Sequence, residues 1–157
     1  MKIRIAEMKD AAVLDEMLTK LIRYESRWDG NLDEEYSVKD NYSSMIGHPD
    51  CRIFIADCDG QPVGFLCALI YRFPMYRKPV VILDALYIEE SHRRNGYATK
   101  LMMELKHFAQ DVGASSIELK VFSENAVASS LYIAHGFSET KKYMKLNMAL
   151  AELEERI

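Results

Sequence analysis

The sequence predicts an α+β domain built around a mixed β-sheet. In the first half of the chain, apolar stretches of strand length follow one another with short turns between them. In the second half, strands and helices alternate. A chain of 157 residues with 49% apolar side chains also buries enough surface for one core without a disulfide or a metal.

The first elements follow from side-chain periodicity. Charged and apolar residues alternate over residues 2–5, which predicts a short strand. Residues 9–25 carry apolar side chains at helical spacing and predict an amphipathic helix. A second helix, weakly periodic, is predicted over residues 34–46, and it ends at Gly47-His48-Pro49.

The middle of the chain predicts a hairpin and a central strand. Two apolar stretches, residues 52–58 and 61–73, flank Asp59-Gly60, a pair typical of a type I′ turn, so the two strands are expected to be antiparallel. Residues 80–88 are almost continuously apolar, as in a strand that is buried on both faces. Asp84 is the one acidic residue within this strand.

Helices and strands alternate in the second half. A helix is predicted from about Gly96 to Gly113, followed by a strand over residues 116–122. Asn125 is a suitable cap for a helix that ends at Gly136.

Strand-like sequence then extends over residues 137–148, and residues 149–157 form a short charged tail of helical character. We therefore expect one domain over residues 1–148 and a C-terminal tail over residues 149–157.

Composition excludes several classes of protein. The chain has 20 Lys and Arg against 24 Asp and Glu, a formal charge of −4, so we expect no nucleic-acid partner. No apolar run approaches the roughly 18 residues of a membrane span, and the N-terminus lacks the apolar core of a signal peptide. We expect no membrane partner and a cytoplasmic location. Cys51, Cys58 and Cys67 show no zinc-site spacing, so we expect reduced thiols and no metal.

The loop between the central strand and its helix has the features of an anion site. A helix N-terminus offers unpaired N–H groups and the positive end of the helix dipole. Gly96 lets a ligand approach the backbone, while Arg93 and Arg94 add positive charge that suits a pyrophosphate. Neither the P-loop pattern nor the three-glycine dinucleotide fingerprint is present. By itself, this loop predicts only that an anion binds.

A second motif narrows the interpretation. Asn125, Leu131-Tyr132 and Gly136-Phe137 follow Arg93-x-x-Gly96-x-Ala98 by about thirty residues. In the order and spacing of these two motifs, residues 1–148 resemble the GCN5-related N-acetyltransferase (GNAT) superfamily. The resemblance implies a mostly antiparallel sheet that is splayed between its fourth and fifth strands and flanked by about four helices.

The resemblance also implies a coenzyme site. Acetyl-CoA would be the acetyl donor, with no metal involved. Its pyrophosphate would lie on the loop and first helical turn, and its pantetheine arm would pair with the end of the central strand and touch Asn125. The residues implied for the pyrophosphate are Arg93, Arg94, Asn95, Gly96, Tyr97, Ala98 and Thr99, and those implied for the arm are Leu86, Tyr87 and Ile88.

Two residues are implied in proton transfer. An amine with a pKa near ~10.4 costs roughly 4.6 kcal/mol to present neutral at pH 7, so a base is useful. Asp84 stands where several family members carry a glutamate proposed as the base, and we expect it to act through a water. Tyr132 would protonate the leaving thiolate as general acid. Asp84 as a purely structural residue, and Glu89 or a water chain as the base, remain alternatives.

The resemblance also implies that the first two helices and their connection form a lip over the acceptor site. Residues 25–40, here called the acidic segment, contain six acids and two bases, a local charge of −4, so the rest of the chain is balanced. With Tyr24, Glu25 and Trp28, this region suits a small cationic amine through charge and cation–π contact. A protein or peptide acceptor and a non-catalytic acyl-CoA sensor are the alternatives, and a homodimer is expected.

Overall fold

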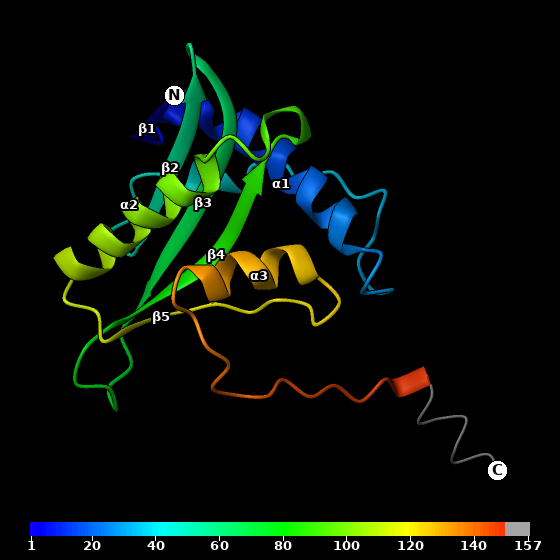
Figure 1. Cartoon of the computed structure of the whole chain (residues 1–157). Coiled ribbons are helices and arrows are strands. Elements are labelled where there is room, and N and C mark those ends of the chain that lie inside the picture. The colour runs from blue at the N-terminus through cyan, green and yellow to red at the C-terminus, as the bar shows by residue number, and fades with distance from the viewer. Residues whose placement is uncertain (150–157) are drawn as a thin grey trace. The chain divides into compact units, whose positions relative to one another are not determined.

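A mixed sheet of five strands, in the order β1-β2-β3-β4-β5, organises the first part of the computed structural model (Figure 1). The structure describes residues 1–149. The chain divides into two compact units, Met1–Glu124 and Asn125–Ile157, and the sheet belongs to the first. The strands are β1 Lys2–Ile5, β2 Cys51–Cys58, β3 Gln61–Tyr71, β4 Val80–Ile88 and β5 Ser116–Glu118.

The predicted hairpin is confirmed. β2 and β3 are antiparallel, and Cys58 pairs with Gln61 across the two-residue turn. Asp59 and Gly60 have φ angles of 51° and 85°, the left-handed values that a type I′ turn requires at both positions. β1 pairs antiparallel with β2, and β3 pairs antiparallel with β4, so the first four strands form a continuous antiparallel sheet.

The sheet opens between β4 and β5, as expected. β5 is parallel to β4 but pairs only with Val80, Val81 and Ile82. The predicted strand over residues 116–122 is thus shorter in the structure. In residues 1–149, no strand lies beside the rest of β4 on that side of the sheet. We call the side of residues 83–88 that faces away from β3 the open edge.

Three α-helices occur in the described residues, where about four were expected. They are α1 Ala11–Glu25, α2 Tyr97–Asp111 and α3 Ala126–Ala134. Along a strand, alternate side chains face opposite sides of the sheet. Ile53 and Ile55 pack in one core cluster with Leu14 and Met17 of α1. Phe54 between them contacts Phe108 of α2 at 6.3 Å between ring centroids. α1 and α2 therefore cover opposite faces of the sheet.

The predicted helix over residues 34–46 is wrong. Only a short 3₁₀ turn, Tyr42–Ser44, forms there. The backbone of this segment bonds to α1 instead: Val38 N–H donates to Thr19 Oγ1 at 2.9 Å, and Tyr42 N–H donates to Asp15 Oδ1 at 3.1 Å. Asp40 has a φ of 55°, which a right-handed helix does not accommodate.

The predicted strand over residues 137–148 is also absent, because residues 137–147 contain no strand. A strand forms only where a neighbour satisfies its N–H and C=O groups, and periodicity in one segment does not supply that neighbour. The predicted tail over residues 149–157 lies outside the described residues, apart from Ala149.

Gly64 lets β3 approach the end of β4. A Cβ atom at Gly64 would stand 2.7 Å from the Tyr87 carbonyl oxygen and 2.5 Å from Ile88 Cδ1. We expect Gly64→Ala to lower the free energy of unfolding by about 1–3 kcal/mol, because backbone has to move to make room. Urea unfolding measures the change, with Gly30→Ala as the control, since nothing lies within 4 Å of a Cβ there. Equal stability of the two variants would contradict the close approach.

Candidate active site

Asp84 occupies a β-bulge in β4. Cys67 of β3 pairs with Ala85, and the next residue, Ala68, pairs with Leu83, so Asp84 has no partner on β3. A bulge bends the strand and re-aims the extra side chain. The Asp84 side chain is exposed, yet the partial loss of hydration beside the sheet raises the pKa of its carboxyl. Bulge and pKa together give an accessible carboxylate that binds a proton more readily than an ordinary aspartate.

The open edge follows directly after this bulge. On the β3 side, Leu86 pairs with Leu66, Ile88 pairs with Gly64, and Glu89 N–H donates to the Val63 carbonyl at 2.8 Å. The backbone groups that point the other way have no strand to bind in residues 1–149. An extended ligand with amide groups can therefore pair with this edge as an added strand would.

The β4–α2 loop, residues 89–96, has the backbone shape of an anion cradle. Arg94 and Gly96 both lie in the left-handed region, at φ 62° and 82°, with Asn95 between them. The first backbone bond at this end of α2 runs from Lys100 N–H to the Gly96 carbonyl at 3.1 Å, so the preceding amides of the first turn lack helical acceptors. Apart from the neighbouring residues of the chain, no atom of residues 1–149 lies within 4 Å of a Cβ built at Gly96, which leaves room for a ligand.

The Nε atom of Arg93 is bound to the backbone at the end of β4. This nitrogen donates to the Ile88 carbonyl at 2.9 Å, and the Arg93 Cζ lies 5.6 Å from the centroid of the Tyr87 ring. This bond uses one of the five N–H groups of arginine and leaves the two terminal nitrogens for an anion. The end of β4 thus positions both the open edge and the cation of the loop.

Sequence reasoning missed an ion pair that joins α1 to the same loop. Lys20 Nζ lies 2.7 Å from Glu89 Oε1, and the Tyr87 hydroxyl donates to Glu89 Oε2 at 3.2 Å. Lys20 and Glu89 are 69 positions apart, so no local pattern signals the contact. Both Glu89 oxygens therefore have partners, Lys20 and Tyr87.

The end of α1 forms an aromatic group with its own cation. The rings of Tyr24 and Trp28 are 5.1 Å apart, and Trp28 also contacts Phe122 at 5.8 Å. Arg27 lies over the Tyr24 ring at 4.1 Å and near the Trp28 ring at 5.6 Å. Glu25, which follows Tyr24 in the chain, is half-buried, and loss of hydration raises the pKa of its carboxyl. Arg27 therefore covers a face of the Tyr24 ring, which was predicted to bind a cationic acceptor.

The second unit carries the other two predicted residues. Asn125 is the N-cap of α3, because its Oδ1 accepts a hydrogen bond from Ala128 N–H at 3.1 Å. Tyr132 is half-buried on the same helix, and its ring lies 5.8 Å from that of Phe137. The capped helix fixes where both side chains stand within this unit.

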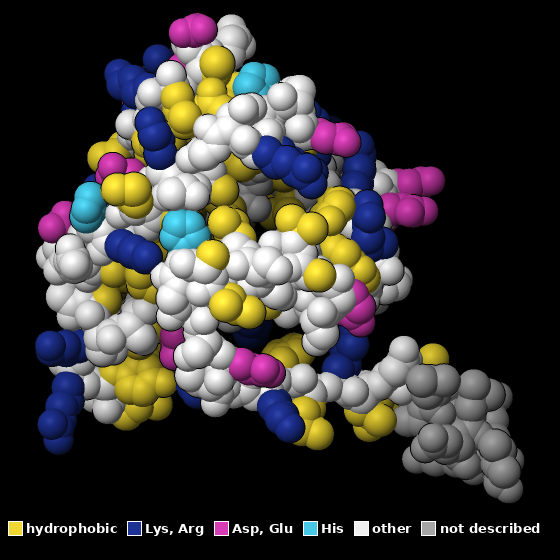
Figure 2. Space-filling model, in the orientation of Figure 1, with side chains coloured by type: hydrophobic (Ala, Val, Ile, Leu, Met, Phe, Trp, Pro, Cys, Tyr) yellow, Lys and Arg dark blue, Asp and Glu magenta, His cyan; other side chains and the backbone are white. Residues whose placement is uncertain are grey.

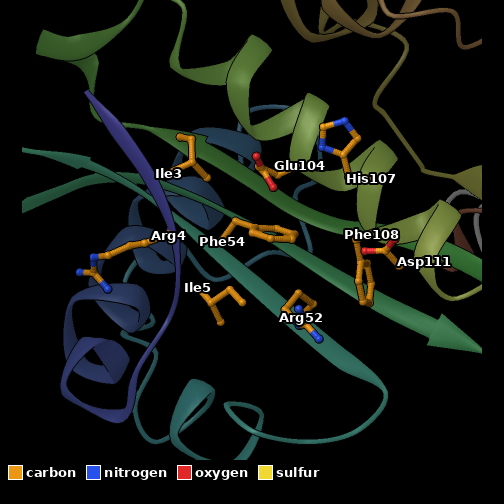
Figure 3. Close-up of a pocket in the computed structure, with 9 residues that line it drawn as sticks. All are labelled: Ile3, Arg4, Ile5, Arg52, Phe54, Glu104, His107, Phe108 and Asp111. Atoms are coloured by element: carbon orange, nitrogen blue, oxygen red, sulfur yellow. The ribbon is translucent and has the colours of Figure 1, made fainter.

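The structure places the predicted residues in three groups. Asp84, residues 86–88 and residues 93–99 lie on one continuous strand, loop and helix; Tyr24, Glu25 and Trp28 lie at the end of α1; Asn125 and Tyr132 lie on α3. A separate hollow of about 180 Å³ between β1, β2 and α2 contains none of these residues (Figure 3). Its floor includes Phe54 and Phe108.

Neither a metal cluster nor a membrane-spanning helix occurs in the described residues. Among residues 1–149, no three His, Cys, Asp or Glu side chains are grouped so as to hold a metal ion. None of the helices within the described part of the chain has the length and apolar character needed to cross a membrane.

Comparison with known proteins identifies the family. A model of the acetyltransferase (GNAT) family matches residues 15–137. The match covers more than half of the chain, and the chain therefore belongs to the GNAT acetyltransferase family.

Relatives come from animals and bacteria. N-acetyltransferase 8B of Mus musculus is 29% identical over 112 residues, which cover 71% of this chain and 48% of that protein. Aminoglycoside N(6')-acetyltransferase type 1 of Klebsiella aerogenes is 26% identical over 114 residues, covering 71% of this chain and 75% of that protein. The chain spans about half the length of the animal relatives that it matches.

Solved structures share the fold. A mutant of the BH1408 protein from Bacillus halodurans superposes with a TM-score of 0.85 at 16% identity, covering 94% of this chain and 99% of that one. Aminoglycoside N-acetyltransferase AAC(6')-Iy in complex with CoA has a TM-score of 0.72 at 21% identity, covering 93% and 98%. The predicted α+β fold with a splayed mixed sheet is confirmed.

Proposed function

We propose that this chain is an enzyme that transfers an acetyl group from acetyl-CoA directly to a primary amine of a small cationic molecule. The observation that carries the proposal is the continuity of an open strand edge with an anion cradle, both belonging to β4 and the loop that follows it. The names of its relatives support the same reaction class, and one related fold was solved with CoA.

The donor is assigned along this strand and loop. The terminal nitrogens of Arg93 and the amides of residues 94–99 bind the pyrophosphate of acetyl-CoA. The backbone of Leu86, Tyr87 and Ile88 pairs with the amides of the pantetheine arm, and Asn125 also contacts the arm. A β4 N–H aimed at the thioester oxygen stabilises the negative charge that develops there during transfer.

Proton transfer accompanies the exchange of bonds. The amine nitrogen attacks the thioester carbon, a C–N bond forms, and the C–S bond breaks with its electron pair on sulfur. Asp84 accepts the amine proton through a water, and its raised pKa suits that role. Tyr132 donates its hydroxyl proton to the departing thiolate.

The acceptor is assigned to the end of α1. The acidic segment has a charge of −4, and its first residue, the half-buried Glu25, follows Tyr24 in the chain. Because Arg27 already covers one face of the Tyr24 ring, carboxylates rather than ring faces select a cationic amine here. The aminoglycoside acetyltransferases among the similar proteins act on molecules of this charge class.

The test is release of CoA thiol from acetyl-CoA across a panel of amines. The panel contains polyamines, amino sugars, neutral amines, acidic amines and peptides with free N-termini. We expect the highest kcat/KM with polyamines or amino sugars. A peptide as the best substrate would contradict the proposal of a small-molecule acceptor. Tight binding of acetyl-CoA without turnover on any amine would contradict the proposal that the chain catalyses acetyl transfer.

Removal of the Arg93 guanidinium should weaken coenzyme binding. We expect acetyl-CoA to raise the melting temperature of the wild type and Arg93→Met to bind it about 10- to 100-fold more weakly, as when one charge-assisted bond is lost. Titration calorimetry measures the affinity, and thermal unfolding measures the shift in melting temperature. Lys106→Met, which removes a cation farther along α2, is the control and should bind as the wild type does. Equal affinity of the two variants would contradict the cradle.

Loss of the Tyr132 hydroxyl should slow the chemical step. We expect Tyr132→Phe to lower kcat about 100-fold or more with little change in the Kd of acetyl-CoA. An acetyl thioester whose thiol has a lower pKa should reduce this deficit, because that leaving group needs less protonation. Tyr76→Phe, on an exposed loop, is the control. A deficit that is the same for all thioesters would argue against general-acid catalysis.

Asp84 should set the acidic limb of the pH profile. Only the ionised carboxylate accepts a proton, so activity falls as the pH falls through the pKa of Asp84, and the raised pKa places this fall at higher pH than for an ordinary aspartate. We expect Asp84→Asn to lose most of the activity and to lose this fall in activity at low pH. Asp84→Glu should recover part of the activity and part of its dependence on pH. An unchanged profile in Asp84→Asn would assign the base elsewhere.

A further inference from the structure

The loop between β3 and β4 gathers aromatic and basic side chains that the proposed reaction does not use. Residues 71–79, here called the aromatic loop, read Tyr-Arg-Phe-Pro-Met-Tyr-Arg-Lys-Pro and carry three cations and no acid. The loop extends beyond the ends of its two strands in Figure 1. In Figure 2, hydrophobic side chains with Lys and Arg beside them mark the same region.

The apolar side chains of the loop are largely exposed. Exposed fractions are 43% for Tyr71, 41% for Phe73, 76% for Met75 and 43% for Tyr76. Such a group is unfavourable in water unless a partner covers it, and exposed apolar patches of this kind mark protein or membrane contacts.

The rings hold one another in a fixed arrangement. Tyr71 and Phe73 are stacked at 5.2 Å between centroids, and Phe73 and Tyr76 meet edge to face at 5.4 Å. Tyr76 N–H donates to the Phe73 carbonyl at 3.0 Å, which closes a tight turn with Met75 at its tip. The loop thus presents a preformed apolar tip.

Cations surround the base of this tip. Arg72 Nε lies 3.4 Å from Asp50 Oδ1, an exposed and therefore weak pair. The structure gives Arg77 and Lys78 no carboxylate within ion-pair distance in residues 1–149, and both side chains are exposed. Even with Asp50 counted, the local charge is +2, on a chain whose total charge is −4.

Composition alone predicts no membrane partner, but from this geometry we propose that the aromatic loop docks the protein on an anionic membrane surface. Tyr and Phe side chains with Met75 enter the headgroup region, while Arg72, Arg77 and Lys78 bind lipid phosphates and carboxylates. Aromatic rings and flanking cations are the residues that favour the membrane interface, and anionic lipids attract each nearby cation.

The same geometry argues against other partners. Single-stranded nucleic acid binds on open ring faces, and here one face each of Tyr71 and Phe73 is covered by the other ring. A peptide typically lies in a groove or along a strand edge, whereas this surface is the tip of a projecting turn. A projecting apolar tip with flanking cations suits an anionic membrane surface, because the apolar side chains can enter the headgroup region while the cations bind the lipid headgroups.

Vesicle binding tests the proposal. The 157-residue chain is sedimented with vesicles of phosphatidylcholine alone, or of phosphatidylcholine with phosphatidylserine, at low and high salt. We expect at least tenfold tighter binding to the anionic vesicles, and loss of this preference at high salt. No binding to anionic vesicles, or equal binding to both kinds, would overturn the proposal.

Matched variants separate the two contributions. Arg77→Gln with Lys78→Gln should weaken binding about fivefold for each cation removed. The control is Lys141→Gln with Lys142→Gln, two exposed lysines that are consecutive in the chain, and it should weaken binding less. Met75→Ser should weaken binding at every salt concentration, and Met103→Ser, an exposed methionine of α2, should not. Unchanged melting temperatures show that the variants are folded, since all these side chains are exposed.

Two further results would assign the aromatic loop to a partner other than a membrane. Light scattering that shows a wild-type dimer, with Met75→Ser a monomer, would assign the loop to a contact between copies of this chain. Binding of a single-stranded oligonucleotide that needs Arg77 and Lys78, without vesicle binding, would assign it to nucleic acid. Either result overturns the proposal.

Discussion

Within residues 1–149, β4 has a neighbouring strand on both edges only over its first three residues, and the proposed chemistry depends on this. β5 ends at Glu118, the partner of Ile82, and the bulge at Asp84 bends β4 two residues farther along the strand. Backbone N–H and C=O groups at the resulting edge need water or a ligand as partner. The open edge of β4 therefore remains available for an added strand or an extended ligand, while pairing with β3 holds the opposite edge in position.

The surroundings of this edge are organised by charge. The Ile88 carbonyl orients Arg93, whose guanidinium group lies 5.6 Å from the Tyr87 ring centroid, and Glu89 joins Tyr87 to Lys20 of α1. The loop that is suited to an anionic coenzyme and the helix that is suited to a cationic acceptor are thus connected through one carboxylate. In the proposed function, the positive loop complements the anionic coenzyme and the acidic segment complements the cationic acceptor.

Local sequence was sufficient wherever the chain's own backbone or a tight turn decides the structure. Asp59-Gly60 specifies its turn because both residues tolerate positive φ, and Asn125 specifies a helix start because its side chain caps an amide three residues on. It failed over residues 34–46, where the side chains of Thr19 and Asp15 capture the backbone amides. It failed again over residues 137–147, where a strand pattern has no strand beside it in the described residues.

The sequence by itself determined the family, since the Arg93-Gly96-Ala98 and Asn125-Tyr132-Gly136 motifs need only order and spacing to be recognised. It also located the excess negative charge in residues 25–40. Only the tertiary structure decided that Asp84 stands on a bulge, that Glu89 binds Lys20, and that Arg27 covers the Tyr24 ring. The bulge depends on register between strands, and the Lys20–Glu89 pair joins residues 69 positions apart. Even the neighbouring Arg27 and Tyr24 meet only because of side-chain direction, which spacing does not fix.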